Sequence, residues 1–434
     1  MCLNRNLLFL GLILAPASAT AEPAVLTLSE AREEALRLHP TLDEYRSRIA
    51  QARYKVEEAY VPARPTAQIR TGYTYLNPIQ TVNFLGRNLA ISQANNYDAT
   101  ATLQWTLLSF GRLKWGTLAA ELSERTAREE YRREQLRAWE EVSLAYYDLA
   151  QQADQLRVAQ AEVAVQRKSL ADAQIQEQAG AVAHFDVLRS QATLTQSQQN
   201  LLVAESNRTV SRANLASLLN KPTGYDFQVE ELAVPPQEQV SLQPSIDFAF
   251  DHRPDLVAYE WSVKAAQAQV GAAASENAPS LGMQGQYVNQ NSTAFQLGQQ
   301  WSAGLTLTFP VYDGGLSSAH TKEAKESLRQ LLDNRELLRR QAAVEVETLF
   351  HQLRTTWQQI IVNQDQLMQN REAERVAALR YNNGLGTQLE LLDSQRQRIA
   401  SEQALIAARY QYLGALTRWK RSLGQELPGV THGS

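Results

Sequence analysis

The sequence of 434 residues contains one cysteine, Cys2, which lies before the first apolar run. A cysteine that anchors a lipid would follow such a run. If the N-terminal segment is removed as a signal, the mature chain has no thiol, which excludes disulfides and cysteine metal sites. Only Met283 and Met368 would then remain as sulfur ligands. Their scarcity argues against a dedicated pathway for soft metals.

The chain also lacks a strong charge excess and long apolar runs. Its formal net charge of −4 suggests neither a nucleic-acid partner nor disorder. After the N-terminal segment, no apolar run approaches the ~20 residues that a transmembrane helix needs. If the protein is in a membrane, we therefore expect it to be there as strands.

Recognisable catalytic motifs are absent as well. The six histidines show no HExxH and no close paired spacing, so metal-dependent hydrolysis has no support. Neither GxxxxGK[ST] nor GxGxxG occurs, so nucleotide binding has none. We expect a protein that is not an enzyme, that has no cofactor, and that takes its energy from a partner.

The N-terminus is typical of a secretory signal peptide. Arg5 supplies the positive charge, Leu7 to Leu14 form a short apolar core, and Ala19-Thr20-Ala21 is a small-x-small cleavage site. The mature chain would then begin at Glu22. A membrane-anchor helix is the weaker alternative because the apolar run is far below the length needed to span a bilayer.

The stretch that organises the chain is Leu113 to Gln178, which has no proline and no glycine after Gly116. It predicts one helix of ~60–65 residues, a rod ~90–100 Å long. Such a helix does not fit inside an ordinary globular domain and indicates a coiled coil or an assembly. A second copy runs from Leu316 to Asn382.

The second half of the chain repeats the first. His39-Pro40-x-Leu42-x-x-Tyr45 matches Arg253-Pro254-x-Leu256-x-x-Tyr259 at an offset of 214 (253 minus 39). Further on the offset is 204, as Gly180 and Gly384 show (384 minus 180). Glycines and prolines shared at a constant offset make chance similarity between two Ala/Gln-rich helices a poor explanation. We expect a signal peptide over 1–21, repeats over 22–222 and 245–426, a linker over 223–244 and a tail over 427–434.

Four short segments change from a helical period to a period of two. A polar loop, Asn77 to Asn96, separates the first two segments. Apolar and aromatic side chains alternate with polar ones that are uncharged apart from Arg70. This suits lipid-facing strands of ~9–11 residues with interfacial aromatics; a soluble sheet with one wet face is the alternative. The expected apolar positions are Ala67, Ile69, Thr71, Tyr73 and Tyr75; Ala99, Ala101, Leu103, Trp105 and Leu107; Leu281, Met283 and Tyr287; and Trp301, Ala303, Leu305, Leu307 and Phe309.

Four strands cannot close a membrane barrel, which needs ~8 or more, and open edges are not viable in lipid. The chain must therefore oligomerise, and three copies would supply twelve strands. A return helix of ~35 residues covers about half of each long helix, and a short helix such as Leu42 to Tyr60 has the length to cover the rest. The expected fold is mixed α and β: a trimeric 12-stranded transmembrane β-barrel, with four strands per chain, continuous with a long α-helical barrel.

From about Leu26 to Leu423, the chain resembles the TolC-like outer-membrane efflux protein family. The resemblance rests on Leu26-Thr27-Leu28-Ser29-Glu30-Ala31 with His39-Pro40, Phe309-Pro310-Val311-Tyr312-Asp313-Gly314-Gly315, Ala145-Tyr146-Tyr147-Asp148-Leu149, and the turns Ala179-Gly180 and Asn383-Gly384. It implies a homotrimer in the cell outer membrane of a Gram-negative bacterium, with a helical tunnel in the periplasm. It also implies two partners: a periplasmic adaptor (membrane fusion) protein and an inner-membrane pump of the RND, ABC or a similar class.

The resemblance also implies a gate. In the family, acidic side chains just after the second turn line a narrow periplasmic entrance, and Glu390 and Asp393 fall on those positions. Asp186 holds the corresponding place after the first turn. Threefold symmetry would make each a ring of carboxylates that favours cations. The alternative is that these residues only complement the helix dipole.

Mutual repulsion of these carboxylates, or pairing with Arg380 and Arg396, would bias the entrance open or closed. At the tips of the rods, the small and exposed turn residues Gly180, Ala181, Gly384 and Leu385 are the expected adaptor contacts; a purely structural turn is the alternative. At the strand-to-helix junctions the expected key residues are Gly111, Pro310, Gly314 and Gly315. The first junction, Leu107 to Gly111, lacks the proline and has one glycine.

The sequence thus predicts a passive outer-membrane exit duct of a tripartite efflux pump or a type I secretion system. A soluble periplasmic coiled-coil scaffold or adaptor protein is the alternative. Drug efflux, metal efflux and protein secretion are not distinguished by these residues, and neither is the gating trigger.

Overall fold

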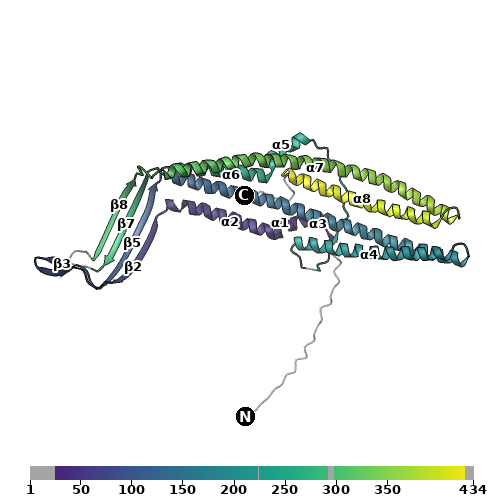
Figure 1. Ribbon diagram of the computed structural model, residues 1–434, viewed down its shortest axis with the longest axis horizontal. Helices are drawn as coiled ribbons and strands as arrows, with labels where there is room; N and C mark the ends of the chain where they lie inside the picture. The colour runs from purple at the N-terminus through teal and green to yellow at the C-terminus, as the bar shows by residue number, and fades with distance from the viewer. Residues whose placement is uncertain (1–24, 223, 292–297, 426–434) are drawn as a thin grey trace, which may run out of the picture. The chain divides into compact units, whose positions relative to one another are not determined.

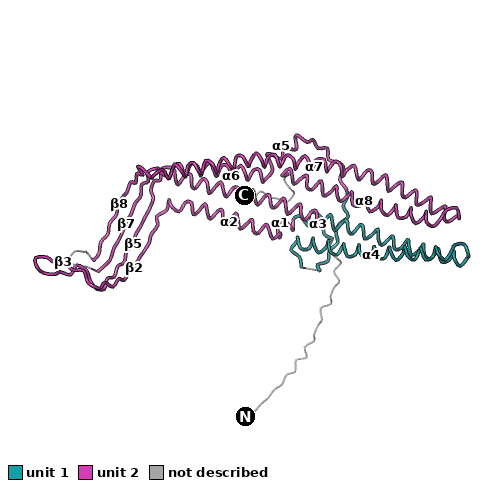
Figure 2. The backbone as a smooth tube through the Cα atoms, in the orientation of Figure 1, with its two compact units in different colours: residues 1–32, 145–233 teal, residues 33–144, 234–434 magenta. Residues whose placement is uncertain are grey.

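The computed structural model describes residues 25–222, 224–291 and 298–425. The expected signal peptide, including Cys2, and the expected tail over 427–434 lie outside these residues. The described chain forms two compact units (Figure 2). The first holds the chain up to Arg32 together with Ala145–Ala233, and the second holds Glu33–Leu144 and the chain from Val234 onward. These units differ from the sequence repeats because one long helix contributes to both.

The helices recur in four pairs of equal length (Figure 1). The pairs are α1 (Leu28–Leu38) with α5 (Leu242–His252), α2 (Pro40–Tyr60) with α6 (Pro254–Ala274), α3 (Arg112–Gln178) with α7 (Leu316–Asn382), and α4 (His184–Leu218) with α8 (Gln388–Ser422). The long helices each have 67 residues and their return helices 35. The predicted internal duplication is therefore confirmed. Among the described residues, no helix combines the length and the apolar character needed to cross a membrane.

Two helices cover α7, one after the other. Near the start of α7, Asn277 donates a 2.5 Å hydrogen bond to Ser317, and Arg335 lies 3.6 Å from Glu260 of α6. Further along, α8 takes over and its Tyr412 and Trp419 join a buried cluster on α7 (Figure 1). The α7 members of that cluster are Val346, Leu349, Phe350, Leu353, Ile360 and Leu367. A short helix and a return helix thus share the length of one long helix, as expected from their lengths.

The four main strands form one antiparallel sheet in the order β2 (Thr66–Tyr75), β5 (Asn95–Leu108), β7 (Ser280–Gln290) and β8 (Gln299–Thr308). β2 and β8 are its edges, and each has one side without a partner strand in the described chain. The short 3-10 helix Val61–Ala63 leads into β2.

Two expectations for this region need correction. β5 begins at Asn95 rather than Ala99, so Asp98 belongs to the strand. The expected loop from Asn77 to Asn96 contains a hairpin of β3 (Thr81–Phe84) and β4 (Arg87–Ala90). The reason is local: Leu85 and Gly86 both have positive φ (51° and 80°), as a tight two-residue hairpin turn requires.

Tyr146 organises the first unit. β1 (Val25–Leu26) pairs in parallel with β6 (Gln228–Val229), a two-residue strand within the expected linker. The buried Tyr146 hydroxyl donates to the Leu26 carbonyl at 2.8 Å and accepts from the Glu230 amide at 3.0 Å. Burial raises the pKa of Tyr146 to about 12. One phenol therefore connects α3 to both strands.

The neighbours of Tyr146 act in the same unit. Arg32 donates to the Tyr147 hydroxyl at 3.1 Å, and Ser211 of α4 donates to Asp148 at 2.5 Å. The Ala145-Tyr146-Tyr147-Asp148-Leu149 motif therefore joins α3 to α1, β1, β6 and α4.

We predict that Tyr146→Phe loosens the β1–β6 pair, because the Leu26 carbonyl and the Glu230 amide each lose a hydrogen bond, at a cost of about 1–3 kcal/mol. Amide hydrogen exchange over 25–26 and 228–230 should accelerate. Tyr54→Phe is the matched control, since Tyr54 is 60% exposed. Equal exchange in Tyr146→Phe and wild type would show that the hydroxyl has no such role.

Candidate duct-lining sheet, junctions and helix tips

The sheet has one apolar face and one polar face. Strand register places Ile69 opposite Ala101, Ala101 opposite Tyr287, and Tyr287 opposite Trp301. The predicted apolar positions other than Leu107 and Phe309 therefore share one face, with many large side chains exposed, among them Trp301 at 77% and Ile69 at 78%. A register shift between Thr106 and Leu108 brings Leu108, not Leu107, opposite Leu281, and Phe309 lies beyond the end of β8 at Thr308.

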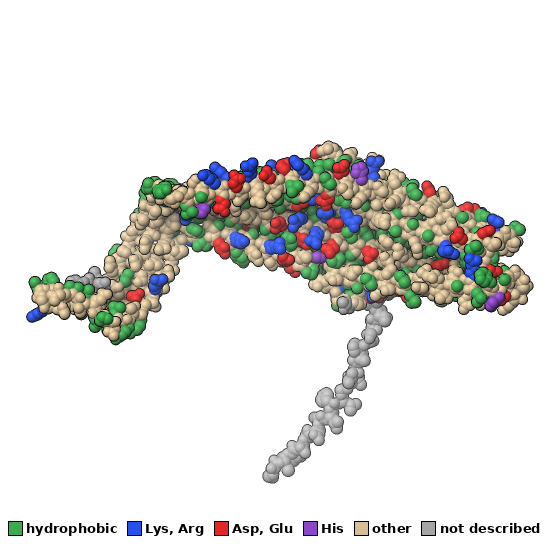
Figure 3. All heavy atoms as spheres, viewed as in Figure 1, with side chains coloured by type: hydrophobic (Ala, Val, Ile, Leu, Met, Phe, Trp, Pro, Cys, Tyr) green, Lys and Arg blue, Asp and Glu red, His purple; other side chains and the backbone are tan. Residues whose placement is uncertain are grey.

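The opposite face carries glutamine, threonine and serine. Its residues include Gln68, Arg70 and Thr74; Asp98, Thr100, Thr102 and Gln104; Gln284 and Gln286; and Gln300, Ser302 and Thr306. Arg70 and Asp98 are the only charged residues of the four strands. In the view of Figure 3, charged side chains are dense over the helices and sparse over the strands.

The second strand-to-helix junction is capped by Asp313. Its carboxylate accepts from the amides of Gly315 at 2.9 Å and Ser317 at 2.8 Å. Hydrogen bonds from the side chain and amide of Ser317, and from Gly315, hold the pKa of Asp313 well below its usual range. Gly314 and Gly315 have φ of 72° and 90°, which favours glycine. Pro310 lies exposed just beyond β8.

The first junction makes the same turn with different residues. Phe110 and Gly111 hold the positions of Gly314 and Gly315 and also have positive φ, 41° and 112°. A left-handed Phe110 carries strain of about 1–2 kcal/mol. Thr106 holds the position of Pro310, so β5 runs on to Leu108 because no missing amide stops it.

Each long helix ends at the predicted glycine. Gly180 and Gly384 have φ of 73° and 71°, and the Ala181 and Leu385 amides each donate 2.8 Å hydrogen bonds back to the helix end. These are the bonds of a Schellman-type stop. Leu385 is 73% exposed. At the first tip, His184 lies 2.7 Å from Glu177 across the turn.

The candidate gate residues lie on the first turns of the return helices. The Glu390 amide donates to the Thr387 hydroxyl at 3.3 Å, and the Glu390 carboxylate lies 3.9 Å from Arg380 at the end of α7. Asp393 accepts from Gln397 at 2.9 Å. In the described chain, Arg396 makes no ion pair with either carboxylate. Of the two basic neighbours proposed from the sequence, Arg380 is thus the one that approaches a candidate gate residue, Glu390.

Asp186 holds the corresponding place on α4, where its amide donates to the Ala183 carbonyl at 3.0 Å. It belongs to the first compact unit, whereas Glu390 and Asp393 belong to the second.

Charged side chains cross-link α7 and α8 above the second tip. Arg398 lies 2.6 Å from both Glu374 and Glu402, and Arg371 lies 3.1 Å from Glu402. The Arg398 and Glu374 side chains are about one-fifth exposed, 19% and 21%. Ion pairs shielded to this degree are stronger than fully solvated ones. They therefore hold α7 and α8 together in the turns next to Glu390 and Asp393.

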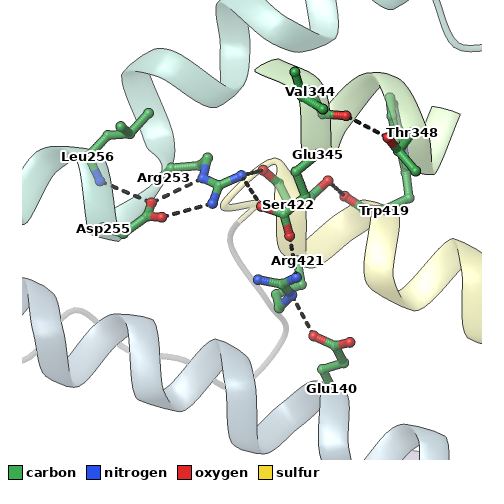
Figure 4. A network of polar contacts seen from close by, with 10 residues as sticks. All are labelled: Glu140, Arg253, Asp255, Leu256, Val344, Glu345, Thr348, Trp419, Arg421 and Ser422. Carbon is green, nitrogen blue, oxygen red and sulfur yellow. Dashed lines mark hydrogen bonds and ion pairs between the residues drawn. The ribbon is translucent and has the colours of Figure 1, made fainter. Parts of the chain in front are cut away.

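A second ion-pair network joins α6, α7 and α8 (Figure 4). Buried Arg253 donates to both oxygens of Asp255 at 3.0 and 2.8 Å, to Glu345 of α7 at 2.8 Å, and to the Ser422 carbonyl of α8 at 3.4 Å. Arg253 matches His39 in the sequence repeat, but its partner Glu345 lies 92 residues further along the chain.

Arg421 extends this network to α3 (Figure 4). It lies 2.6 Å from Glu345 and 2.5 Å from Glu140. Burial raises the pKa of Asp255 and Glu345, but the Arg253 guanidinium outweighs it, so both carboxyls have a lowered pKa. Both are therefore charged at neutral pH, and the network stabilises the contact of four helices.

No group of three or more histidine, cysteine, aspartate or glutamate side chains suited to hold a metal ion occurs in the described ranges.

The family model for "Outer membrane efflux protein" matches residues 31–221 and 246–425. Among curated relatives, the probable efflux pump outer membrane protein SepC of Pseudomonas putida is 25% identical over 347 residues, covering 76% of this chain and 69% of the relative. The outer membrane protein TolC of Vibrio cholerae is 22% identical over 330 residues, covering 73% and 74%. Among solved structures, CusC aligns with a TM-score of 0.79 at 19% identity, covering 92% of each chain.

We predict that Glu345→Gln lowers the thermal unfolding temperature, because Arg253 and Arg421 each lose a charged partner. Breaking a buried pair costs about 3–5 kcal/mol, and since the Glu345 side chain is 33% exposed we expect about 1–3 kcal/mol. Glu372→Gln, in the exposed pair with Arg375, is the control and should leave the melting curve unchanged. Far-UV circular dichroism measures both.

The stability that Asp255 and Glu345 contribute is expected to fall as the pH is lowered. The folded pKa values of Asp255 and Glu345 lie below the unfolded ones, so their contribution is complete above about pH 4.5 and is lost as the pH falls through the folded values. The difference in melting temperature between wild type and Glu345→Gln should therefore shrink in acid. A constant difference from pH 7 to pH 3 would contradict this role.

Proposed function

Because this chain belongs to the outer membrane efflux protein family, we propose that three copies form one duct, whose barrel lies in the outer membrane and whose helices extend through the periplasm toward an adaptor and an inner-membrane pump. The protein is an outer-membrane efflux channel, with its helical part in the periplasm. The family consists of channels, which are not enzymes.

The two-faced sheet with open edges is the observation that carries this proposal. Lipid favours the face that exposes Ile69, Tyr73, Trp301 and Leu305, and water favours the face of glutamine and threonine. The free sides of β2 and β8 need partners, because an unpaired backbone group in hydrocarbon costs several kcal/mol. Pairing β2 of one copy with β8 of the next supplies them, and three copies close a barrel of twelve strands.

The helices extend this duct away from the membrane. Since α3 and α7 each have 67 residues, each is about 100 Å long. Their tips are small and exposed, as a docking surface requires. We assign Gly180, Ala181, Gly384 and Leu385 to contacts with the periplasmic adaptor, and a pump of the RND, ABC or a similar class to the inner membrane beyond it.

We assign the constriction of the duct to the tips. Glu390, Asp393 and Asp186 lie within the first three turns of their helices, where three copies would form carboxylate rings. The Arg380 guanidinium lies 3.9 Å from the Glu390 carboxylate, and this contact supports a gate in which the ion pair helps to hold the entrance closed. Substrate would then pass passively, driven by the pump.

We predict that the double variant Glu390→Gln, Asp393→Asn lowers the ratio of cation to anion permeability, because it removes six carboxylates from the trimeric entrance. Single-channel recording in planar bilayers measures this ratio and the frequency of closure. Asp43→Asn with Glu44→Gln, two exposed carboxylates on α2, is the control. Unchanged cation preference and unchanged closure would reject the gate.

We also predict that the mature protein is recovered from the outer-membrane fraction only with detergent, as a trimer by native mass measurement. The soluble scaffold makes the opposite prediction. A monomer recovered from a detergent-free periplasmic extract would reject the duct.

A further inference from the structure

The two charges of the sheet lie close together on its polar face. Register places Arg70 opposite Thr100 and Gly72 opposite Asp98. Arg70 and Asp98 are therefore diagonal neighbours on adjacent strands, a relation in which Cα atoms are about 7–8 Å apart and long side chains reach one another. Among the described residues, no ion pair joins either charge to another residue; Arg70 is exposed and Asp98 is half-buried on the same polar face.

Gly72 makes room for the carboxylate. A Cβ atom at this position would collide with Asp98, and the Asp98 Cγ atom would lie only 3.0 Å from it. The Asp98 side chain thus extends over β2, the edge strand that also carries Arg70. Glycine weakens a strand interior unless another group approaches its backbone closely. Here that group is a carboxylate, and it lies beside Thr74 and Thr100 rather than among apolar side chains.

Lipid does not explain these charges. An arginine on the lipid face of a membrane barrel costs about 2–4 kcal/mol at the midplane, whereas both charges occur on the face without aromatic rings. The three copies would bring three guanidinium and three carboxylate groups to one level of the water-filled barrel. Resting on the proposed function, we propose that Arg70 and Asp98 form a ring of alternating charge that sets the ion selectivity of the barrel, separately from Glu390 and Asp393 at the tips.

An alternating ring acts differently from a ring of one sign. Each Arg70 offsets the attraction of a neighbouring Asp98 for cations, so the barrel discriminates weakly between single ions. The transverse field between the two charges orients solutes that carry both signs, such as zwitterions. Removal of one partner leaves three like charges, which favour counter-ions.

The test uses single-channel reversal potentials in planar bilayers at about 0.1 M salt, where the Debye length is about 10 Å. The full mature chain carries Asp186→Asn, Glu390→Gln and Asp393→Asn as a fixed background, so that the tip carboxylates do not dominate. Arg70→Gln should raise the ratio of cation to anion permeability about two- to fourfold, and Asp98→Asn should lower it by a similar factor. The double variant should return to the ratio of the background.

Two controls separate charge from shape. Arg70→Lys keeps the charge and should keep the ratio, and Thr100→Asn changes a neutral neighbour on the same face. If Asp98→Asn fails to assemble, Arg70→Gln and the charge reversal Arg70→Glu decide the matter, because both should move the ratio toward cations. Channels with unchanged ratios in these variants would overturn the ring. Absence of channels in the background protein itself would instead reject the proposed duct.

Discussion

The unpaired backbone groups at the two edges of the sheet are the constraint on which the rest of the structure depends. One face of the sheet exposes aromatic and aliphatic side chains, so it favours lipid, yet β2 and β8 each leave backbone donors and acceptors open. Lipid offers no hydrogen bonds to satisfy them. Strand pairing between copies is the remaining solution, and it makes the oligomer a condition of the membrane location. The helices then become the walls of a shared structure.

The duplication explains how one chain builds such walls. Each repeat supplies two main strands, a 67-residue helix, and shorter helices of 11, 21 and 35 residues; in the second repeat α6 and α8 cover α7 one after the other. The helices repeat in length, but the strands, the loop between them and the side chains do not. Phe110 adopts the positive φ at a cost in strain, whereas Gly314 adopts it without strain. Thr106 lies within β5, whereas Pro310 at the matching position lies beyond the end of β8.

Periodicity and glycine placement predicted most of the fold. The ends of the long helices followed from Gly180 and Gly384, because glycine acts there through local backbone geometry, whereas α2 and α6 begin at Pro40 and Pro254 rather than at the predicted Leu42 and Leu256. Side-chain alternation predicted the apolar face of the sheet, including Trp301 of β8. The register shift at Leu108, the two-residue strand at Gln228 and the inclusion of Asp98 in β5 were not predictable, since each depends on a partner strand rather than on local pattern.

Long-range polar contacts were invisible in the sequence for the same reason. Arg253 and His39 occupy matching places before a proline and both are buried, but only the arginine reaches a carboxylate on another long helix. The return helices diverge likewise: Arg398 bridges Glu374 and Glu402, where the first repeat has Leu194, Leu170 and Gln198 at the matching positions. Because protonation and salt screening weaken ion pairs, we expect pH and salt to act on the Arg398 contacts of the second hairpin, which have no counterpart at the matching positions of the first. The charged side chains near the second tip can therefore differ from those near the first tip while the helices of the two hairpins keep equal lengths.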